Sequence, residues 1–318
     1  MENNEAQTKK PFLDKKFGYV AKGSSLKTEA VAGLTTFLAM AYILIVNSGM
    51  FSALDGVSFD AMYVTTALSA IVGTILIGLL ANLPLAQAPG MGLNAFFVYT
   101  VCFTLGFSYA NALVFVLLDG IVFILLTVTG LRKIVFEAIP PAVKKAIPAG
   151  IGLFIAFIGL QGANLVVNDD STLLTYVKFV GDFHTIGIGA LLALIGLFII
   201  VVLHHKNIKG SILIGILATW ILGMICEAIG LYVPDGKEFY SLYPTFRMID
   251  FGAFGTTFGQ CFNVDFSGVD ILNFIAVLFA FLFVDIFDTL GTLIGVSTKA
   301  NMLDEEGKLP RIRPALLA

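Results

Sequence analysis

The chain has 318 residues, of which 58% are hydrophobic and 13% are charged, and its formal net charge is -3. An average soluble domain has about a quarter of its residues charged, and the mean hydropathy of this chain is +0.92. Such a composition cannot supply the polar surface of a soluble globular protein, and its slight negative charge gives no electrostatic footprint for nucleic acid. We therefore predict an all-α membrane protein that crosses the bilayer several times.

Residues 1–27 precede the first apolar run and are rich in lysine. They lack the apolar central region of a signal peptide. We expect a cytoplasmic N-terminal leader, with a surface helix at 11–20.

Apolar runs of about 20 residues, the length that crosses the hydrocarbon core of a bilayer, follow along the rest of the chain. They predict eight spans, at 29–50, 61–82, 85–106, 109–130, 149–167, 186–204, 210–232 and 271–295. The stretch 233–270 is expected to be an extracellular loop. It could act as a lid, but a simple cover over the helix bundle is the favoured interpretation.

The distribution of basic residues predicts the orientation, because cytoplasmic loops of membrane proteins are enriched in lysine and arginine. With the N-terminus inside, sixteen of the 19 basic residues are cytoplasmic, and Lys178, Lys237 and Arg247 are outside. The cytoplasmic set is Lys9, Lys10, Lys15, Lys16, Lys22, Lys27, Arg132, Lys133, Lys144, Lys145, Lys206, Lys209, Lys299, Lys308, Arg311 and Arg313. We expect a multi-pass protein of the cell membrane with both ends of this chain in the cytoplasm.

Four acidic residues fall within the predicted spans, where an ionisable side chain is costly unless it has a partner or a function. Glu227 is close to the outer end of its span, so a structural role is favoured for it. Asp119 lies in the middle of the fourth span, where a hydrogen bond to a neighbouring helix is the favoured interpretation. Asp285 and Asp288 remain as the acids most indicative of function.

Asp285 and Asp288 are three residues apart, so they share one face of the eighth span with Thr289 and Thr292. Two carboxylates without a basic residue in the same span cannot both stay ionised at low cost, so at least one is expected to take up a proton. Proton coupling in a transporter requires such a group. The alternative is that both acids only form hydrogen bonds between helices.

The third span begins with a segment that cannot be a regular helix, because Pro84 and Pro89 lack N–H donors and Gly90 and Gly92 loosen the backbone. Irregular backbone at membrane depth is typical of transporter substrate sites. Asn94 follows and offers both a donor and an acceptor. A kinked helix packed through its small residues is the alternative.

Three segments resemble one known family: QAPGMGLNAFF at 87–97, AGLTTFLAMAYI at 32–43 and VDIFDT at 284–289. They are similar to the AzgA-like purine permeases of the nucleobase:cation symporter-2 group, and the resemblance runs from about Lys27 to the end. It implies fourteen spans in two inverted repeats of seven, which form a core domain and a gate domain. It also implies a substrate site between the third, eighth and tenth spans.

The resemblance implies roles for individual residues. Asn94 and Asp285 match residues that bind the purine, Gly92 matches a glycine beside the site, and Asp288 matches an acid needed for transport. The expected substrate-binding residues are Asn94, Asp285, Gly92, Gly90, Phe96 and Thr289, and the expected proton-coupling residues are Asp285 and Asp288. The implied function is proton-coupled uptake of hypoxanthine and guanine, or of adenine, by a homodimer without a cofactor other than the coupling ion.

The chain departs from the family pattern in length. Residues 28–232 correspond to the first seven-span repeat and residues 271–318 to the first span of the second repeat with the following cytoplasmic loop. The tenth span, which should supply another acid, is missing. We expect a sequence truncated at its C-terminus that cannot complete a transport cycle alone.

Two other functions are alternatives to transport of purines. An anion transporter or channel of similar fold, for sulfate or bicarbonate, is expected to use helix N-termini and a basic residue, whereas the eighth span offers paired acids. A membrane enzyme is disfavoured, because His184, His204 and His205 fall in loops or at span ends and no nucleophile arrangement is visible. A transporter is therefore preferred.

Overall fold

The computed structural model describes residues 12–131, 140–177, 179, 182–208, 210–235, 239–245, 247–265, 271–302, 304 and 309–317. The first residue of the expected leader helix, Pro11, lies outside the described residues. So do some of the basic residues used to predict the orientation: Lys9, Lys10, Arg132, Lys133, Lys178, Lys209, Lys237 and Lys308.

The first half of the described chain consists of helices joined by short connections. They are α1 (Phe12–Phe17), α2 (Leu26–Met40), α3 (Tyr42–Phe51), α4 (Phe59–Leu76), α5 (Met91–Ala95) and α6 (Tyr109–Thr129). Two π-helical segments, η1 (Ile77–Ala81) and η2 (Phe96–Thr104), continue α4 and α5. Ser25, Ser58 and Ser108 cap α2, α4 and α6 by accepting backbone N–H bonds.

The second half adds four long helices, one short helix, a π-helical segment, two 3-10 helices and a hairpin. Its elements are α8 (Pro141–Gly162), β1 (Val166–Asp169), β2 (Leu173–Tyr176), η3 (Phe183–Gly187), α9 (Ile188–His205), α10 (Ser211–Ala228), η4 (Phe251–Thr256), η5 (Gln260–Phe262), α11 (Ile271–Lys299) and α12 (Ile312–Leu317). The antiparallel pair β1–β2 follows α8 and was not expected in an all-α chain.

Six helices of the described residues are long and apolar enough to cross a membrane. They are Leu26–Phe51, Phe59–Ala81, Tyr109–Thr129, Phe183–His205, Ser211–Ala228 and Ile271–Lys299. Shorter apolar helices, Met91–Thr104 and Gly152–Gly162, lie where the third and fifth spans were predicted. The chain is therefore a mostly helical, multi-pass membrane protein.

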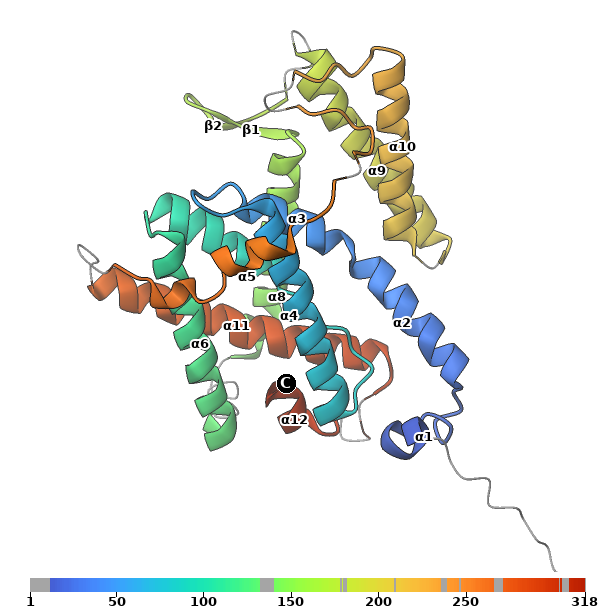
Figure 1. Cartoon of the computed structure of the whole chain (residues 1–318), viewed down its shortest axis with the longest axis vertical. Coiled ribbons are helices and arrows are strands. Elements are labelled where there is room, and N and C mark those ends of the chain that lie inside the picture. The colour runs from blue at the N-terminus through green and yellow to red at the C-terminus, as the bar shows by residue number, and fades with distance from the viewer. Residues whose placement is uncertain are drawn as a thin grey trace, which may run out of the picture.

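The helices form a larger group and a separate pair (Figure 1). In the larger group, α3 packs on α4 and α5, while α11 crosses α6 and contacts α5 and α8. The helices α9 and α10 pack against each other, and α10 also touches α2. This arrangement places α11, with its acids, beside the helices of the broken third span.

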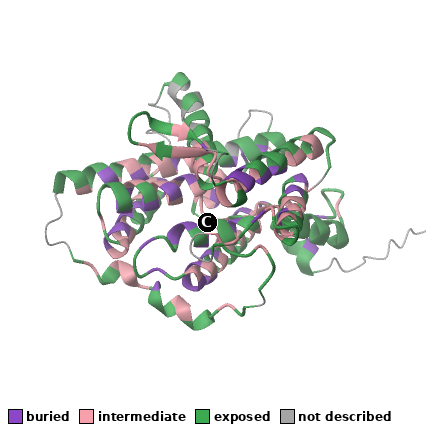
Figure 2. Ribbon diagram, turned by 90° about the horizontal axis from the view of Figure 1, so that it is seen from above, coloured by how far each residue is buried: buried purple, intermediate pink, exposed green. Residues whose placement is uncertain are grey.

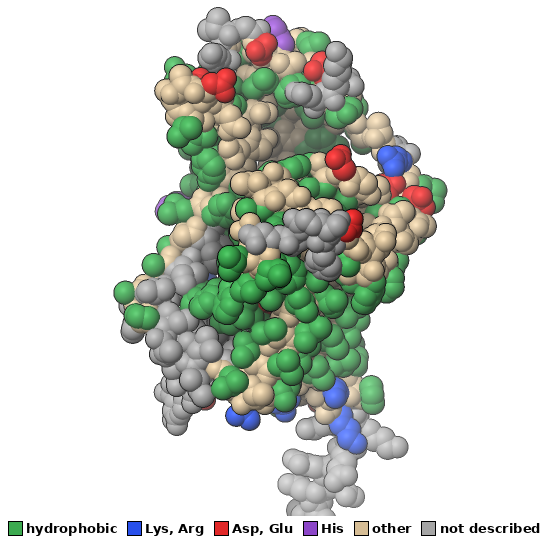
Figure 3. Space-filling model, turned by 90° about the vertical axis from the view of Figure 1, so that its left-hand side faces the viewer, with side chains coloured by type: hydrophobic (Ala, Val, Ile, Leu, Met, Phe, Trp, Pro, Cys, Tyr) green, Lys and Arg blue, Asp and Glu red, His purple; other side chains and the backbone are tan. Residues whose placement is uncertain are grey.

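The main core lies where α3, η2, α6 and α11 meet. Phe115 is fully buried there, with its ring centre 4.6 Å from that of Phe274 and 6.2 Å from that of Phe281. Buried residues concentrate at such contacts between helices, and most outer helix faces are exposed (Figure 2). Hydrophobic side chains cover the middle of the face in Figure 3, with acids toward its upper end and most of the basic side chains at its lower end. Such broad apolar surface is typical of a membrane-facing protein.

The loop before α11 is fixed to the ends of α4 and α6. The guanidinium of Arg247 forms an ion pair with the buried carboxylate of Asp60, which also accepts the Asp250 backbone N–H at 3.3 Å. The side chain of Asn111 donates to the Asp265 carbonyl at 2.6 Å and accepts the Asp265 N–H at 3.2 Å. The described residues 247–265 thus cover this end of the bundle.

Candidate functional site

The third predicted span begins with an extended segment, residues 82–90, between η1 and α5. Asn82 starts it in the left-handed conformation, with φ 54°, which asparagine tolerates better than most residues. Thr74 of α4 holds the segment in place, because its hydroxyl oxygen accepts the Gln87 N–H at 2.9 Å and lies 3.3 Å from the Gln87 carbonyl. The prediction that this span is not a regular helix is confirmed.

The end of the extended segment approaches α11 very closely at Gly90. A Cβ atom placed on Gly90 would lie 2.9 Å from Oδ2 of Asp288, closer than a real side chain allows. The backbone of Gly90 has φ -69° and ψ 120°, so glycine is needed here for space and not for a left-handed conformation. The structure therefore brings together two of the expected site residues from distant parts of the sequence.

Asn94 on α5 is held by a chain of side-chain amides and a hydroxyl. Its Nδ2 donates to Oδ1 of Asn47 on α3 at 2.6 Å, and Nδ2 of Asn47 donates to Oγ1 of Thr66 on α4 at 2.7 Å. Asn47 and Thr66 are 2% and 1% exposed. Within the described residues, the oxygen and the second N–H of the Asn94 carboxamide have no other hydrogen bond, so they can still bind a ligand.

Asn47 and Thr66 are not among the site residues predicted from the sequence. A signal for Asn47 was present, because it is a polar residue within the apolar run of α3, Tyr42–Phe51. An amide buried among lipid-facing helices needs a hydrogen-bond partner. Nothing in the sequence identified that partner as Asn94.

The acids of α11 both have hydroxyl neighbours one turn further along the helix. Thr289 donates to Oδ1 of Asp285 at 3.2 Å, and Thr292 forms a side-chain hydrogen bond with Asp288. Both acids are partly buried. The polar strip predicted from the sequence is therefore present on α11, and Asp288 is the member that faces the broken span.

Gly92 and Phe96, the remaining expected residues, lie on α5 and at the start of η2. Gly92 is buried, and the ring of Phe96 packs edge-to-face on Phe281 of α11 with 5.1 Å between ring centres. The aromatic contact ties η2 to α11. It adds to the contact at Gly90 and keeps the broken span against the acid-bearing helix.

The other two acids of the predicted spans differ sharply in their surroundings. Glu227 accepts the Ser241 hydroxyl at 2.6 Å and the Leu242 backbone N–H at 2.7 Å, which agrees with the structural role predicted for it. Asp119 is 6% exposed, and within the described chain its Oδ1 has no hydrogen-bond partner. Its charge interacts with that of Asp285. The hydrogen bond to a neighbouring helix expected for Asp119 is therefore not formed by Oδ1.

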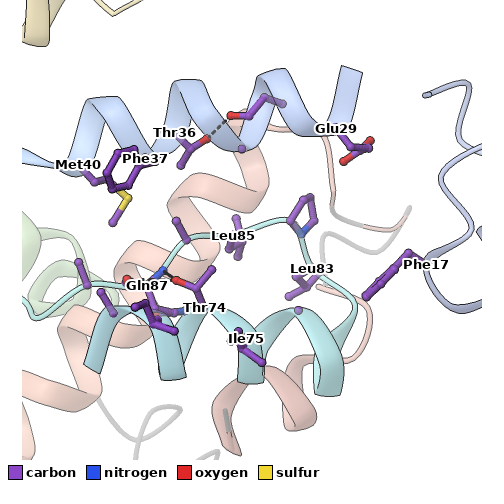
Figure 4. A pocket seen from close by; sticks show the side chains of 18 of the residues that line it. Phe17, Glu29, Thr36, Phe37, Met40, Thr74, Ile75, Leu83, Leu85 and Gln87 are labelled. Carbon is purple, nitrogen blue, oxygen red and sulfur yellow. Dashed lines mark hydrogen bonds between the residues drawn. The ribbon is translucent and has the colours of Figure 1, made fainter. Parts of the chain in front are cut away.

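A cavity of about 780 Å³ lies beside this site, between α2, α4 and the extended segment. Figure 4 shows Phe37 and Met40 of α2 facing Leu85 and Gln87 of the segment across this space. Its walls are mainly apolar, and its lining residues do not include the candidate residues on α5 and α11. Within the described residues, no group of three or more His, Cys, Asp and Glu side chains could hold a metal ion.

Comparison with known proteins identifies relatives over nearly the whole chain. The model of a family described as the permease family matches residues 27–318. The guanine/hypoxanthine permease PbuO of Bacillus subtilis is 42% identical over 301 residues, which cover 93% of this chain and 64% of PbuO. The guanine/hypoxanthine permease PbuG of the same organism is 39% identical over 311 residues, which cover 95% of this chain and 66% of PbuG. The adenine permease AdeP of Escherichia coli is 36% identical over 304 residues, 96% of this chain and 63% of its own. The chain spans slightly less than two thirds of the length of these relatives.

Proposed function

Because this chain belongs to the permease family, we propose that the full-length protein to which it belongs takes up purine nucleobases across the cytoplasmic membrane together with protons. Hypoxanthine and guanine are the preferred substrates, with adenine as a further one, in line with the names of the similar permeases. The observation that carries the proposal is the contact between Gly90 and Asp288. It joins a broken span to an acid-bearing helix, as expected for a transporter substrate site.

The chemistry of the site suits a purine. A purine base offers ring N–H groups and, in hypoxanthine and guanine, a carbonyl oxygen. The Asp285 carboxylate can accept the N–H groups, and the Asn94 carboxamide can donate to oxygen and accept from nitrogen. We assign substrate binding to Asn94, Asp285, Gly92, Gly90, Phe96 and Thr289.

The coupling ion proposed here is the proton, held by the acids of α11. Asp285 and Asp288 lie one turn apart, partly buried, with only Lys299 as a basic residue at the far end of the same helix. Binding a proton reduces the cost of keeping such acids in the membrane. No other cofactor is required.

We also propose the finer architecture. The shorter apolar helices Met91–Thr104 and Gly152–Gly162 would be the third and fifth of eight spans. Residues 1–27 would be a cytoplasmic leader, 28–232 a seven-span repeat, 233–270 an extracellular loop and 271–318 the start of a second, inverted repeat. The separation of acidic and basic side chains in Figure 3 supports a cytoplasmic N-terminus. The proposed assembly is a homodimer.

Binding and uptake of labelled hypoxanthine test the proposed function. Purified protein in nanodiscs should bind [³H]hypoxanthine, and unlabelled guanine but not sulfate should compete. Cells that express the full-length protein and lack their own purine permeases should accumulate the label. Displacement by sulfate and not by purines would replace the proposal with an anion transporter.

The variant Asp285→Asn tests the site within the same assays. It should abolish hypoxanthine binding and uptake while the amount of protein in the membrane stays unchanged. Asp55→Asn is the matched control, because Asp55 is an exposed acid in the turn after α3. Wild-type binding by Asp285→Asn would remove Asp285 from the site.

A further inference from the structure

The proposed function leaves the carboxyl group of Asp119 without a role. Asp119 lies near the middle of α6, and its side chain is 6% exposed. Its Oδ1 finds no hydrogen-bond donor in the part of the chain that the structure describes. A buried carboxylate oxygen without a donor is strongly unfavourable, especially in a membrane.

The charged groups around Asp119 do not offset the cost of burying its carboxylate. The elements that pack most closely against α6 are α11, α12, η2 and η5, and the first turn of α6 also contacts α3, α4 and Asp265. The described titratable side chains of these elements are Asp285, Asp288 and Lys299 on α11, Arg313 on α12, Tyr99 and Cys102 on η2, Cys261 on η5, Tyr42 on α3, and Asp60 and Tyr63 on α4, with Asp265 itself. Lys299 and Arg313 are exposed, whereas the charge of Asp285 interacts with that of Asp119.

Two carboxyl groups that share a poorly solvated site cannot both remain ionised. Asp285 has a hydroxyl donor in Thr289, so it is the better solvated member of the pair. Protonation of Asp119 would remove its charge and the repulsion between the two groups.

We propose that Asp119 is a further proton-binding group that shares the coupling proton with Asp285 and holds it while Asp285 is ionised to bind the purine. The inference deepens the proposed function and rests on its proton coupling. An O–H bond forms on Asp119 with a proton from water while the site faces one side of the membrane. The same bond breaks when the site opens to the other side, and the proton returns to water there.

Asp119→Asn is the direct test, since asparagine keeps the shape of the side chain but cannot release a proton. In proteoliposomes, a gradient of about one pH unit should let the wild-type protein accumulate [³H]hypoxanthine up to about tenfold, because one unit corresponds to a tenfold ratio in proton activity. Asp119→Asn should lose this accumulation but retain exchange of internal for external hypoxanthine without a gradient. Asp55→Asn should behave as wild type in both assays.

The outcomes separate the inference from the function on which it rests. Accumulation that persists in Asp119→Asn overturns the inference. Equal loss of accumulation and exchange, with a lower melting temperature, also overturns it, because it indicates a structural role. Wild-type uptake that does not depend on the pH gradient would contradict proton coupling itself.

Infrared spectroscopy gives a readout that does not require transport. Purified wild-type protein in lipid should show a component of the C=O stretching band of protonated carboxylic acids that disappears in Asp119→Asn and persists in Asp55→Asn. A spectrum unchanged by Asp119→Asn would contradict the inference even if the protein transports nothing.

Discussion

The residues of the candidate site are fixed by their neighbours on other helices. Gly90 leaves no room for a side chain beside Asp288, and Asn94 depends on the amide of Asn47. Each of these contacts joins residues far apart in the sequence. A substitution at one of these residues should therefore displace side chains on another helix.

Gly90→Ala should reduce purine binding by displacing Asp288. The new methyl group would lie 2.9 Å from Oδ2 of Asp288, so the carboxyl group, the far end of its side chain, must turn aside, at a cost below the roughly 1 to 3 kcal/mol of overpacking against fixed atoms. Binding of [³H]hypoxanthine and the melting temperature measure the two effects. Gly33→Ala on α2 is the control, because an added Cβ meets nothing within 4 Å there. Equal binding by both variants would show that the contact at Gly90 is irrelevant to the site.

Asn47→Ala should weaken purine binding, although Asn47 is not one of the proposed purine-binding residues. The substitution leaves Nδ2 of Asn94 and Oγ1 of Thr66 without their partner, which costs roughly 0.5 to 2 kcal/mol and frees the Asn94 side chain to rotate. The affinity for hypoxanthine should fall more than the melting temperature does. Ser69→Ala is a suitable control, because the Ser69 hydroxyl donates within its own helix, to the Thr66 carbonyl. Unaltered affinity in Asn47→Ala would exclude a positioning role.

Among the elements, the positions of the apolar helices could be predicted from the sequence, but only one of their interruptions could. The prolines and glycines at 84–92 predicted the break in the third span. The first predicted span is in fact two helices, α2 and α3, which meet at Ala41, and α5 continues as the π-helix η2. An alanine and an apolar run carry no local signal for such changes, which depend on packing against other helices. The contact between Asn47 and Asn94 was unpredictable for the same reason, because it depends on how two helices are rotated.

The hairpin β1–β2 gives a pH-dependent prediction. The Asp169 carboxylate accepts the backbone N–H groups and the hydroxyls of Ser171 and Thr172 in the hairpin turn. The hydroxyl of Ser171 is the largest of the influences that hold the pKa of Asp169 well below its usual range. This stabilisation is present above the ordinary aspartate pKa of about 4 and is lost as the pH falls toward the lower folded value.

Amide hydrogen exchange of residues 166–176, corrected for intrinsic rates, measures this effect. Protection of the hairpin should decrease as the sample is acidified below about pH 4. In Asp169→Asn, which cannot titrate, protection should change little over the same interval. The same acid response in both proteins would assign it to another group.

At the scale of the whole molecule, the apolar outer surface requires a bilayer. Leu197 on α9 is 55% exposed, within the candidate span Phe183–His205. Leu197→Lys should reduce insertion of this span by roughly 3 kcal/mol, because a lysine near the centre of a span is unfavourable. A glycosylation reporter fused after the span measures the inserted fraction, and Leu197→Met is the control. Normal insertion of Leu197→Lys would show that this face of α9 does not meet lipid.

The close approach of Gly90 to Asp288 makes two positions on different helices interdependent in size. A scan of single substitutions would show that position 90 does not tolerate larger residues, although the atoms that they meet belong to Asp288. Pairing Gly90→Ala with the shorter Asp288→Ser should restore packing, so the effects of the two changes on stability should not add. Transport should remain lost in that double variant, because serine lacks the charge of the carboxyl group. The double variant therefore distinguishes the steric effect of the Asp288 side chain from the effect of its charge.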